Sequence, residues 1–269
     1  MAQVTVAGMT MGFDEARPDG EGGGKTLLLV HGHPFDRSMW QPQLPAVAAA
    51  GWRVIAPDLR GYGATPVTPG RVTLDEFADD LAALLDTLAI DAVVVGGLSM
   101  GGQIAMAFAD RHPHRLRGLV LAATFPRVDT AEVRATRLSN ADRLERDGMR
   151  AFASEVLPKM LAPGTIANQP DVAAFVLRMM QAAPARGAAA ALRGRADRRA
   201  YAPVLADTTV PALIVVGDED AFTTRADADE MHTLLADSDL VWMTGVGHMP
   251  NLERPAAFND ALVQFLARL

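Results

Sequence analysis

The sequence predicts an α/β protein whose sheet is mostly parallel and is flanked by helices. Short, continuous apolar runs recur along the chain at residues 26–30, 53–56, 93–95 and 116–122. Runs of this kind are typical of strands that are covered on both faces. Longer segments with apolar residues at helical spacing separate them, and this alternation indicates parallel strands joined by helices.

The first elements precede that alternation. Apolar residues alternate with others over residues 4–6 and 9–13, which predicts an antiparallel hairpin with one buried face. A glycine-rich surface loop is expected at residues 17–24. Further on, Thr73 is the expected N-cap of a helix, with Glu76 completing a capping box before a helical apolar pattern.

The most informative stretch is Val93 to Ala109, where a strand, a sharp turn and a buried helix follow one another. Ser99 lies at the turn between Gly97 and Gly101, as in the Gly-x-Ser-x-Gly pattern of a nucleophile elbow. The glycines fit because side chains there would collide with the neighbouring strand or helix. Such a turn exposes a serine hydroxyl beside the positive N-terminus of a helix.

The alternation stops after Phe125-Pro126 and returns with a buried strand at residues 212–216. Helical segments fill the interval, and no convincing strand lies between about Thr130 and Ala206. We therefore expect a helical cap, inserted after the sixth strand, over the ends of the strands. The expected domains are a core of residues 1–125 and 207–269 and a cap of residues 126–206.

Composition limits the classes of function. A formal charge of −7 argues against nucleic acid or an anionic membrane surface as a partner. The absence of cysteine excludes disulfides, thiolate metal sites and a cysteine nucleophile. No cofactor or metal site is expected. With no basic leader and no apolar run of the ~18 residues that a membrane span needs, a cytoplasmic protein is expected. The oligomeric state is not indicated.

Six histidines are candidates for the base that a serine nucleophile needs. His112, His114 and His232 lie in polar surroundings and are expected at the surface, whereas His31 ends a buried strand and is expected to support the following loop. His248 follows the last predicted strand in a loop with two glycines. The order serine, acid, histidine along the chain favours His248.

The acid should follow the strand at residues 212–216, which ends in Asp218-Glu219-Asp220. We select Asp220 because it lies furthest into the loop, with Asp58 and Asp129 as weaker alternatives. A buried carboxylate there would hold the histidine in one tautomer and stabilise the imidazolium. Backbone N–H groups of Met100 and His33 are the expected oxyanion donors, and the His33 side chain should line the pocket.

Together these segments resemble the α/β-hydrolase superfamily over nearly the full length. The matching stretches are His31-Gly32-His33-Pro34 with Trp40, Asp58-Leu59-Arg60-Gly61-Tyr62-Gly63, Gly97-Leu98-Ser99-Met100-Gly101-Gly102, Gly217-Asp218-Glu219-Asp220, and Gly245-Val246-Gly247-His248 with Leu252-Glu253-Arg254-Pro255. Within the superfamily the chain looks most like cofactor-free esterases, enol-lactonases and acyl-homoserine-lactone hydrolases. The resemblance implies Ser99 as nucleophile, Asp220 as acid, His248 as base, and His33 and Met100 as oxyanion donors.

We expect a hydrolase of a small carboxylic ester or lactone that acts through an acyl-enzyme. Haloalkane dehalogenases and epoxide hydrolases of this fold attack with an aspartate, so Ser99 argues against both. Two alternatives stay open: a carbon–carbon bond hydrolase of a diketone, which would use the same triad, and a non-catalytic member that binds a small ligand.

The sequence indicates the residues of the substrate pocket less clearly than the other parts of the site. Trp40, Phe152, Phe175 and Met179 are candidates to line it, although most apolar residues of the cap should pack its helices together. The arginines of the cap are expected in solvent. An arginine that faced the pocket would instead favour a substrate that bears a carboxylate.

Overall fold

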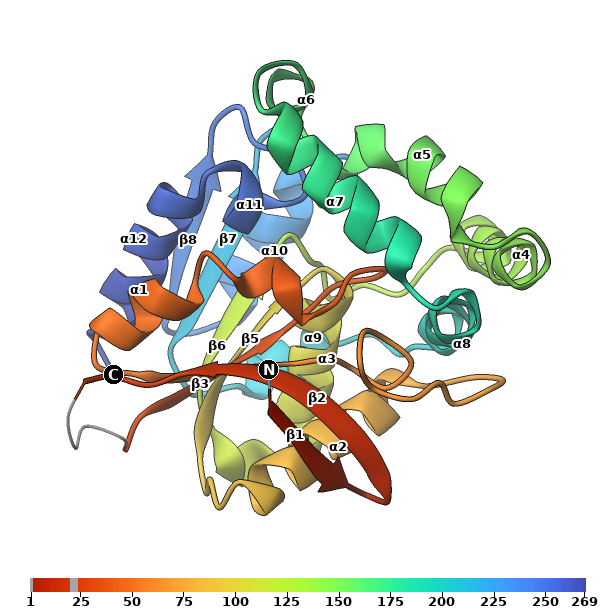
Figure 1. Cartoon of the computed structure of the whole chain (residues 1–269). Helices are drawn as coiled ribbons and strands as arrows, with labels where there is room; N and C mark the ends of the chain where they lie inside the picture. The colour runs from red at the N-terminus through yellow and green to blue at the C-terminus, as the bar shows by residue number, and fades with distance from the viewer. Residues whose placement is uncertain (1, 20–23) are drawn as a thin grey trace.

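A twisted sheet of eight strands forms the centre of the molecule in the computed structural model, which describes residues 2–19 and 24–269 (Figure 1). The strands are β1 (Ala2–Val6), β2 (Met9–Ala16), β3 (Thr26–Val30), β4 (Arg53–Pro57), β5 (Val93–Leu98), β6 (Leu116–Ala122), β7 (Ala212–Gly217) and β8 (Ser238–Met243). Their order across the sheet is β1-β2-β4-β3-β5-β6-β7-β8. From β4 to β8 all neighbours are parallel, as predicted.

The first two strands form the predicted antiparallel hairpin, and β2 also pairs antiparallel with β4. Ala7 and Gly8 make the turn with φ of 47° and 81°, the positive values that a tight two-residue hairpin turn requires. The glycine-rich loop expected at residues 17–24 lies partly outside the described residues.

Helices cover both faces of the sheet because the buried strands have two apolar faces. Leu28 and Val30 of β3 belong to one hydrophobic cluster, whereas Leu27 and Leu29 belong to the other. The first cluster packs α2 (Leu74–Thr87), α3 (Met100–Arg111) and α10 (Arg225–Leu234) on the sheet, and the second packs α1 (Leu44–Ala49) and α12 (Pro255–Leu266). Short helical turns complete the core at η1 (Arg37–Trp40), η2 (Pro113–Arg115) and α11 (Pro250–Glu253).

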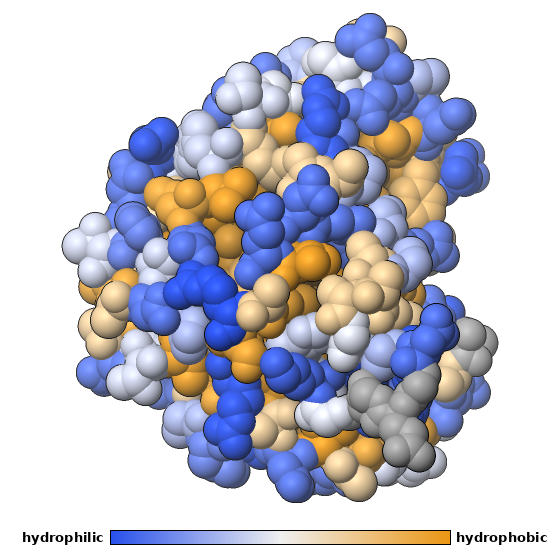
Figure 2. Space-filling model, turned by 90° about the vertical axis from the view of Figure 1, so that its left-hand side faces the viewer, coloured by the Kyte–Doolittle hydropathy of each residue, from blue (hydrophilic) through white to orange (hydrophobic). Residues whose placement is uncertain are grey.

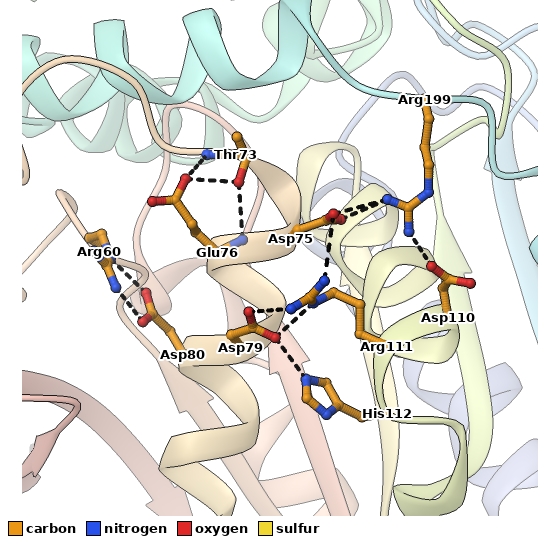
Figure 3. Close-up of polar contacts among 10 residues, drawn as sticks. All are labelled: Arg60, Thr73, Asp75, Glu76, Asp79, Asp80, Asp110, Arg111, His112 and Arg199. Carbon is orange, nitrogen blue, oxygen red and sulfur yellow. Dashed lines mark hydrogen bonds and ion pairs between the residues drawn. The ribbon is translucent and has the colours of Figure 1, made fainter.

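The predicted capping box at the N-terminus of α2 is present. The Thr73 hydroxyl accepts a hydrogen bond from the Glu76 N–H at 3.2 Å, and the Glu76 carboxylate accepts one from the Thr73 N–H at 2.7 Å (Figure 3). These two bonds satisfy backbone donors that the first turn of a helix leaves free.

Six helices lie between β6 and β7, in a stretch that the structure describes completely. They are α4 (Ala131–Asp147), α5 (Met149–Met160), α6 (Pro163–Asn168), α7 (Pro170–Ala182), α8 (Ala185–Ala196) and α9 (Ala202–Asp207). We call residues 123–211 the helical insertion. In Figure 1 the helices α4 to α8 gather beyond one end of the sheet, whereas α9 packs against α3 and α10 of the core.

Close backbone contacts join α8 to the core. A Cβ on Gly187 would lie 1.9 Å from the carbonyl oxygen of Gly61, and one on Gly194 would lie 1.7 Å from that of Val72. Only glycine allows such an approach at either place.

Ion pairs join the end of the insertion to α2 and α3. Arg199 contacts Asp75 at 2.9 Å and also pairs with Asp110 (Figure 3). The arrangement holds the insertion on the side of the sheet where α2 and α3 pack.

The surface carries few large exposed apolar side chains. Figure 2 shows the side of the molecule where α1 and α12 lie, and hydrophobic residues there form small areas separated by hydrophilic ones. Within the described residues, the large hydrophobic side chains that are exposed are Val67, Val128 and Val133. In that same part of the chain, no helix has both the length and the apolar character needed to cross a bilayer.

Candidate active site

Ser99 occupies the sharp turn between β5 and α3. Its φ of 56° and ψ of −114° are rare for a residue with a side chain, so the backbone is strained there. A Cβ on Gly97 would lie 2.2 Å from the backbone of Gly101, and one on Gly101 would lie 2.1 Å from the Val30 carbonyl oxygen. The two glycines are therefore required by crowding, as the sequence predicts.

His248 and Asp220 form a buried pair after β8 and β7. Nδ1 of His248 lies 2.9 Å from each carboxylate oxygen of Asp220. Because a carboxylate only accepts, Nδ1 carries the hydrogen and Nε2 is left free for other chemistry. The two loops meet because β7 and β8 are parallel neighbours that end at the same edge of the sheet.

Asp220 is held in its ionised form. Burial alone would raise the pKa of its carboxyl, but the charge and hydrogen bond of His248 outweigh that effect and lower the pKa. The N–H groups of Phe222 and Thr223 add hydrogen bonds at 2.8 and 3.2 Å. The ring of Phe222 also lies 4.7 Å from that of His248, so the imidazole is fixed on two sides.

Ser99 and His248 both line one cavity of about 450 Å³. No hydrogen bond joins the two side chains among the residues that the structure describes. Bonds of this kind are often long in unliganded enzymes and tighten when substrate binds. Residues of the insertion, among them Phe152 of α5 and Leu192 of α8, also line this cavity.

The loop that follows β3 lies directly against the serine. A Cβ on Gly32 would be 3.4 Å from the Cβ of Ser99. His31 holds this loop, because its Nδ1–H donates to the Gly32 carbonyl at 2.9 Å and its Nε2 accepts from the Leu59 N–H at 3.0 Å. His31 is thus a structural residue, as predicted.

The two expected oxyanion donors directly follow the two residues of this contact: His33 follows Gly32, and Met100 follows Ser99. Neither the N–H of His33 nor that of Met100 has a hydrogen-bond acceptor within the described part of the chain. The His33 side chain lines the cavity, as predicted, and a hydrogen bond of 2.8 Å joins its Nδ1 to the Tyr62 hydroxyl. Both backbone N–H groups are therefore free of protein acceptors in the described residues.

The other carboxylates weighed for the acid have different partners. Asp58 is wholly buried and bonds to the backbone and side chain of Arg37 and to the Ala64 N–H. Asp218 accepts from the Gly245 N–H at 2.7 Å. Asp129 bonds to two arginines of the insertion. Among these candidates, Asp220 is the one that the structure brings to His248.

Of the four apolar residues predicted to line the pocket, one lines the cavity and three do not. Phe152 lines the cavity, and its ring lies 6.5 Å from that of His33. The cavity wall does not include the other three. Trp40 is fully buried beside Phe258, Met179 accepts a hydrogen bond from Ser38, and Phe175 is half-buried among apolar side chains. Helical spacing does not distinguish a residue that faces a cavity from one that packs a helix.

The expectation that the arginines of the insertion lie in solvent is wrong for two of them. Arg195 and Arg198 are 6% and 9% exposed, and Arg195 lines the cavity together with Arg137. A signal was present for Arg195: it lies seven residues after Ala188 and three after Leu192, on the apolar face of α8. Phe125 and Phe222 also line the cavity without having been predicted.

Clusters of side chains that could bind a metal ion are not found in the described residues. Across residues 2–19 and 24–269, no three histidine, aspartate or glutamate side chains gather so as to hold an ion.

The fold and this site together identify the class. The sequence profile of the α/β hydrolase family matches residues 27–261, and the chain belongs to that family. It is 28% identical to 3-oxoadipate enol-lactonase 2 of Acinetobacter baylyi over 242 residues, 90% of this chain and 88% of that protein. It is 32% identical to the pimeloyl-[acyl-carrier protein] methyl ester esterase of a Neisseria meningitidis strain, over 87% of this chain and 90% of that protein.

Solved structures agree with the class. A malate-bound thermophilic esterase from Thermogutta terrifontis superposes with a TM-score of 0.94 at 34% identity, covering 99% of this chain and 98% of the other. The enol-lactonase from Burkholderia xenovorans has a TM-score of 0.90 at 29% identity, with 99% and 100% of the two chains covered. These similarities to enzymes named esterase and enol-lactonase support a hydrolase.

Proposed function

We propose that this protein is a serine hydrolase that cleaves a small carboxylic ester or lactone through an acyl-enzyme. One observation carries the proposal: a strained serine at a helix N-terminus lines the same cavity as a buried histidine, and that histidine is paired with an aspartate. The backbone N–H groups of His33 and Met100 have no acceptor in the described residues, which supports their use as oxyanion donors. This combination is what acyl transfer by a serine requires.

In the proposed reaction, Ser99 Oγ attacks the carbonyl carbon while His248 Nε2 accepts the hydroxyl proton. The oxyanion that forms accepts hydrogen bonds from the N–H groups of His33 and Met100, each worth ~3–4 kcal/mol of transition-state stabilisation in comparable sites. Collapse of this intermediate breaks the bond to the alkoxide, and His248 donates its proton to that oxygen.

Water completes the cycle. His248 takes a proton from the water that attacks the acyl-enzyme, and returns it to Ser99 as the acid leaves. For a lactone, acid and alcohol leave as one molecule. Asp220 holds the Nδ1–H throughout and stabilises the imidazolium, a task that suits a carboxylate with a lowered pKa.

The helical insertion would act as a cap in this scheme. Its residues make up much of the lining of the cavity that Ser99 also lines, which supports a role in excluding water and in shaping the acyl or alcohol subsite. The proposed cap is residues 126–206.

A phosphonate probe tests the proposal directly. An active-site fluorophosphonate should label Ser99, located by peptide mass spectrometry, and labelling should stop turnover of p-nitrophenyl acetate. Labelling elsewhere, or turnover that survives complete labelling, would contradict the assignment. A parallel assay with a diketone whose carbon–carbon bond can be hydrolysed distinguishes ester chemistry from the alternative that uses the same groups.

A further inference from the structure

Arg195 is a buried cation on the wall of the candidate active-site cavity. It lies in the last turn of α8, is 6% exposed, and lines the space that Ser99 and His248 also line. Its Nε donates to the Gln103 side-chain oxygen at 3.1 Å. In the described part of the chain, its guanidinium has no other hydrogen bond and no ion pair. A guanidinium has five N–H donors, so most of them are available to a ligand.

The nearby carboxylate is already shared. Asp129 is the one acidic side chain on the cavity wall formed by the described residues. Arg137 donates to it at 2.6 and 3.1 Å, and Arg198 donates to it at 2.6 Å. Burial alone would raise the pKa of Asp129, but these two arginines hold it at about 2. The positive charges of Arg137 and Arg198 together already exceed the single negative charge of Asp129, so no carboxylate charge is left for Arg195.

The environment of Arg195 is therefore short of negative charge. Burial, and then the charges of Arg137 and Arg198, lower the pKa of Arg195, so the folded protein disfavours its charge. Arginine nevertheless stays protonated in proteins, and a buried charge is costly unless it is paired. The same positive field reaches the loop after β3, since burial together with Arg195 and Arg137 lowers the pKa of His33.

We infer that Arg195 binds a carboxylate of the substrate, so that the protein acts on esters or lactones that carry a second, ionised carboxyl group. This inference rests on the proposed hydrolase and specifies its substrate class. The planar fork of arginine matches a carboxylate in two parallel hydrogen bonds. The anion would supply the charge that the cavity wall lacks, while the scissile carbonyl lies at Ser99.

Paired substrates test the inference. Monoethyl glutarate and its neutral isostere ethyl 4-carbamoylbutanoate place the charge on the acyl side, and 4-acetoxybutanoate and 4-acetoxybutanamide place it on the alcohol side. The wild-type protein should have a kcat/KM about tenfold or more higher for the anionic member of at least one pair, because hydrogen bonds to charged groups are strong.

Variants then assign the preference to Arg195. Arg195→Met should bring the anionic-to-neutral ratio close to one, chiefly by raising KM for the anionic ester, and Arg195→Lys should restore part of the ratio. Arg186→Met is the matched control, since Arg186 is an exposed residue of the same helix, and it should keep the wild-type ratio. Each ratio is measured within one preparation, so a partly misfolded variant does not alter it.

The outcomes separate this inference from the proposed function. Equal kcat/KM within both pairs, or a preference that Arg195→Met keeps, would overturn the inference and leave the hydrolase intact. Absence of all ester hydrolysis would instead overturn the hydrolase. In that case calorimetric binding to the Ser99→Ala variant decides: monoethyl glutarate should bind more tightly than the amide, and adding Arg195→Met should remove the difference. No difference would overturn the anion subsite as well.

Discussion

The two walls of the cavity are built in different ways. On the sheet side, Ser99 and His248 line the cavity, and they and Asp220 each follow the end of a parallel strand. A crowded turn fixes Ser99, and the Asp220 carboxylate accepts from nearby backbone N–H groups and from His248. On the insertion side, the charges that line the cavity come from separate segments, among them Asp129 before α4, Arg137 within it, and Arg195 at the end of α8. In the proposed enzyme, therefore, local turns place the reacting groups, whereas the packing of distant helices places the groups that bind substrate.

Substitutions on the two sides of the cavity should therefore affect different properties of the protein. Changes on the sheet side should remove turnover and leave the fold, because each side chain has its own local support. Changes on the insertion side should alter stability or substrate choice, because its charged side chains form ion pairs with one another and changing one leaves its partners unpaired.

The largest effect is expected on the sheet side, from Ser99→Ala. If Ser99 is the nucleophile as proposed, its loss should lower kcat for p-nitrophenyl acetate by about 10⁶-fold, as the loss of the catalytic serine does in subtilisin. The circular dichroism spectrum and melting temperature should stay close to wild type. Ser154→Ala, in an exposed position of α5, is the matched control and should keep full activity. Activity retained by Ser99→Ala would place the reaction elsewhere.

Asp220→Asn should be next, with kcat about 10⁴-fold lower, because an amide favours the wrong tautomer of His248. Steady-state kinetics on the same ester measures it. Asp218→Asn changes a neighbouring acid that bonds only to the Gly245 N–H in the described residues, and it should cost far less. Equal losses in the two variants would contradict the assignment of the acid.

Asp129→Asn tests the insertion side. It leaves Arg137 and Arg198 without their shared carboxylate, so the free energy of unfolding should fall by about 3–5 kcal/mol. Urea denaturation measures the change. Asp142→Asn, which removes an exposed carboxylate of α4 paired with Arg193, is the control and should cost less than about 1 kcal/mol. A small effect of Asp129→Asn would mean that the insertion does not depend on this cluster.

The lowered pKa of Asp129 also predicts how the stability of the protein depends on pH. Because the pKa of Asp129 is about 2 in the folded protein, below its usual value, its contribution to stability is complete above that usual value. The contribution should be lost as pH falls towards 2. The stability difference between wild type and Asp129→Asn should therefore shrink on acidification, and a difference that does not change with pH would contradict the ion pairs.

The smallest effect is expected from Gly187→Ala, where α8 touches the core loop at Gly61. The added Cβ meets backbone at 1.9 Å, so the helix must shift, at a cost of about 1–3 kcal/mol in the free energy of unfolding. Gly164→Ala has open space around the new Cβ and should not destabilise. If the shift also lowers the preference for anionic esters, the position of α8 sets the position of Arg195.

Much of the sheet side could be predicted from sequence because its signals are short. The glycines around Ser99 lie within two residues of it, and their spacing alone indicates the turn that the structure shows. His248 was chosen from the order serine, acid, histidine along the chain, and the structure brings it to Asp220 because β7 and β8 are parallel neighbours that end at one edge of the sheet. The choice among three neighbouring acids depended on loop position, and geometry separates Asp220 from Asp218.

The insertion side could be predicted only in outline. Its helices follow from apolar spacing and from the absence of strands, but the same spacing is shared by Phe152, which lines the cavity, and Phe175, which does not. The charges were misjudged for a similar reason. An arginine at helical spacing has the same sequence signature in solvent as in a buried cluster, and the partners of Arg198 lie up to 71 residues away.

By itself, the amino-acid sequence determined the parallel sheet, the strained turn at Ser99 and the placement of Asp220 and His248 after neighbouring strands, since each depends on residues close together in the chain or on the direction of strands. Only the tertiary structure decided that Arg195 is buried on the cavity wall without a carboxylate of its own. That outcome depends on the approach of α8 to Gly61 and Val72 and on Asp129 being shared by two other arginines. Burial and charge balance are properties of packed segments, and packing brings together residues that the sequence keeps apart.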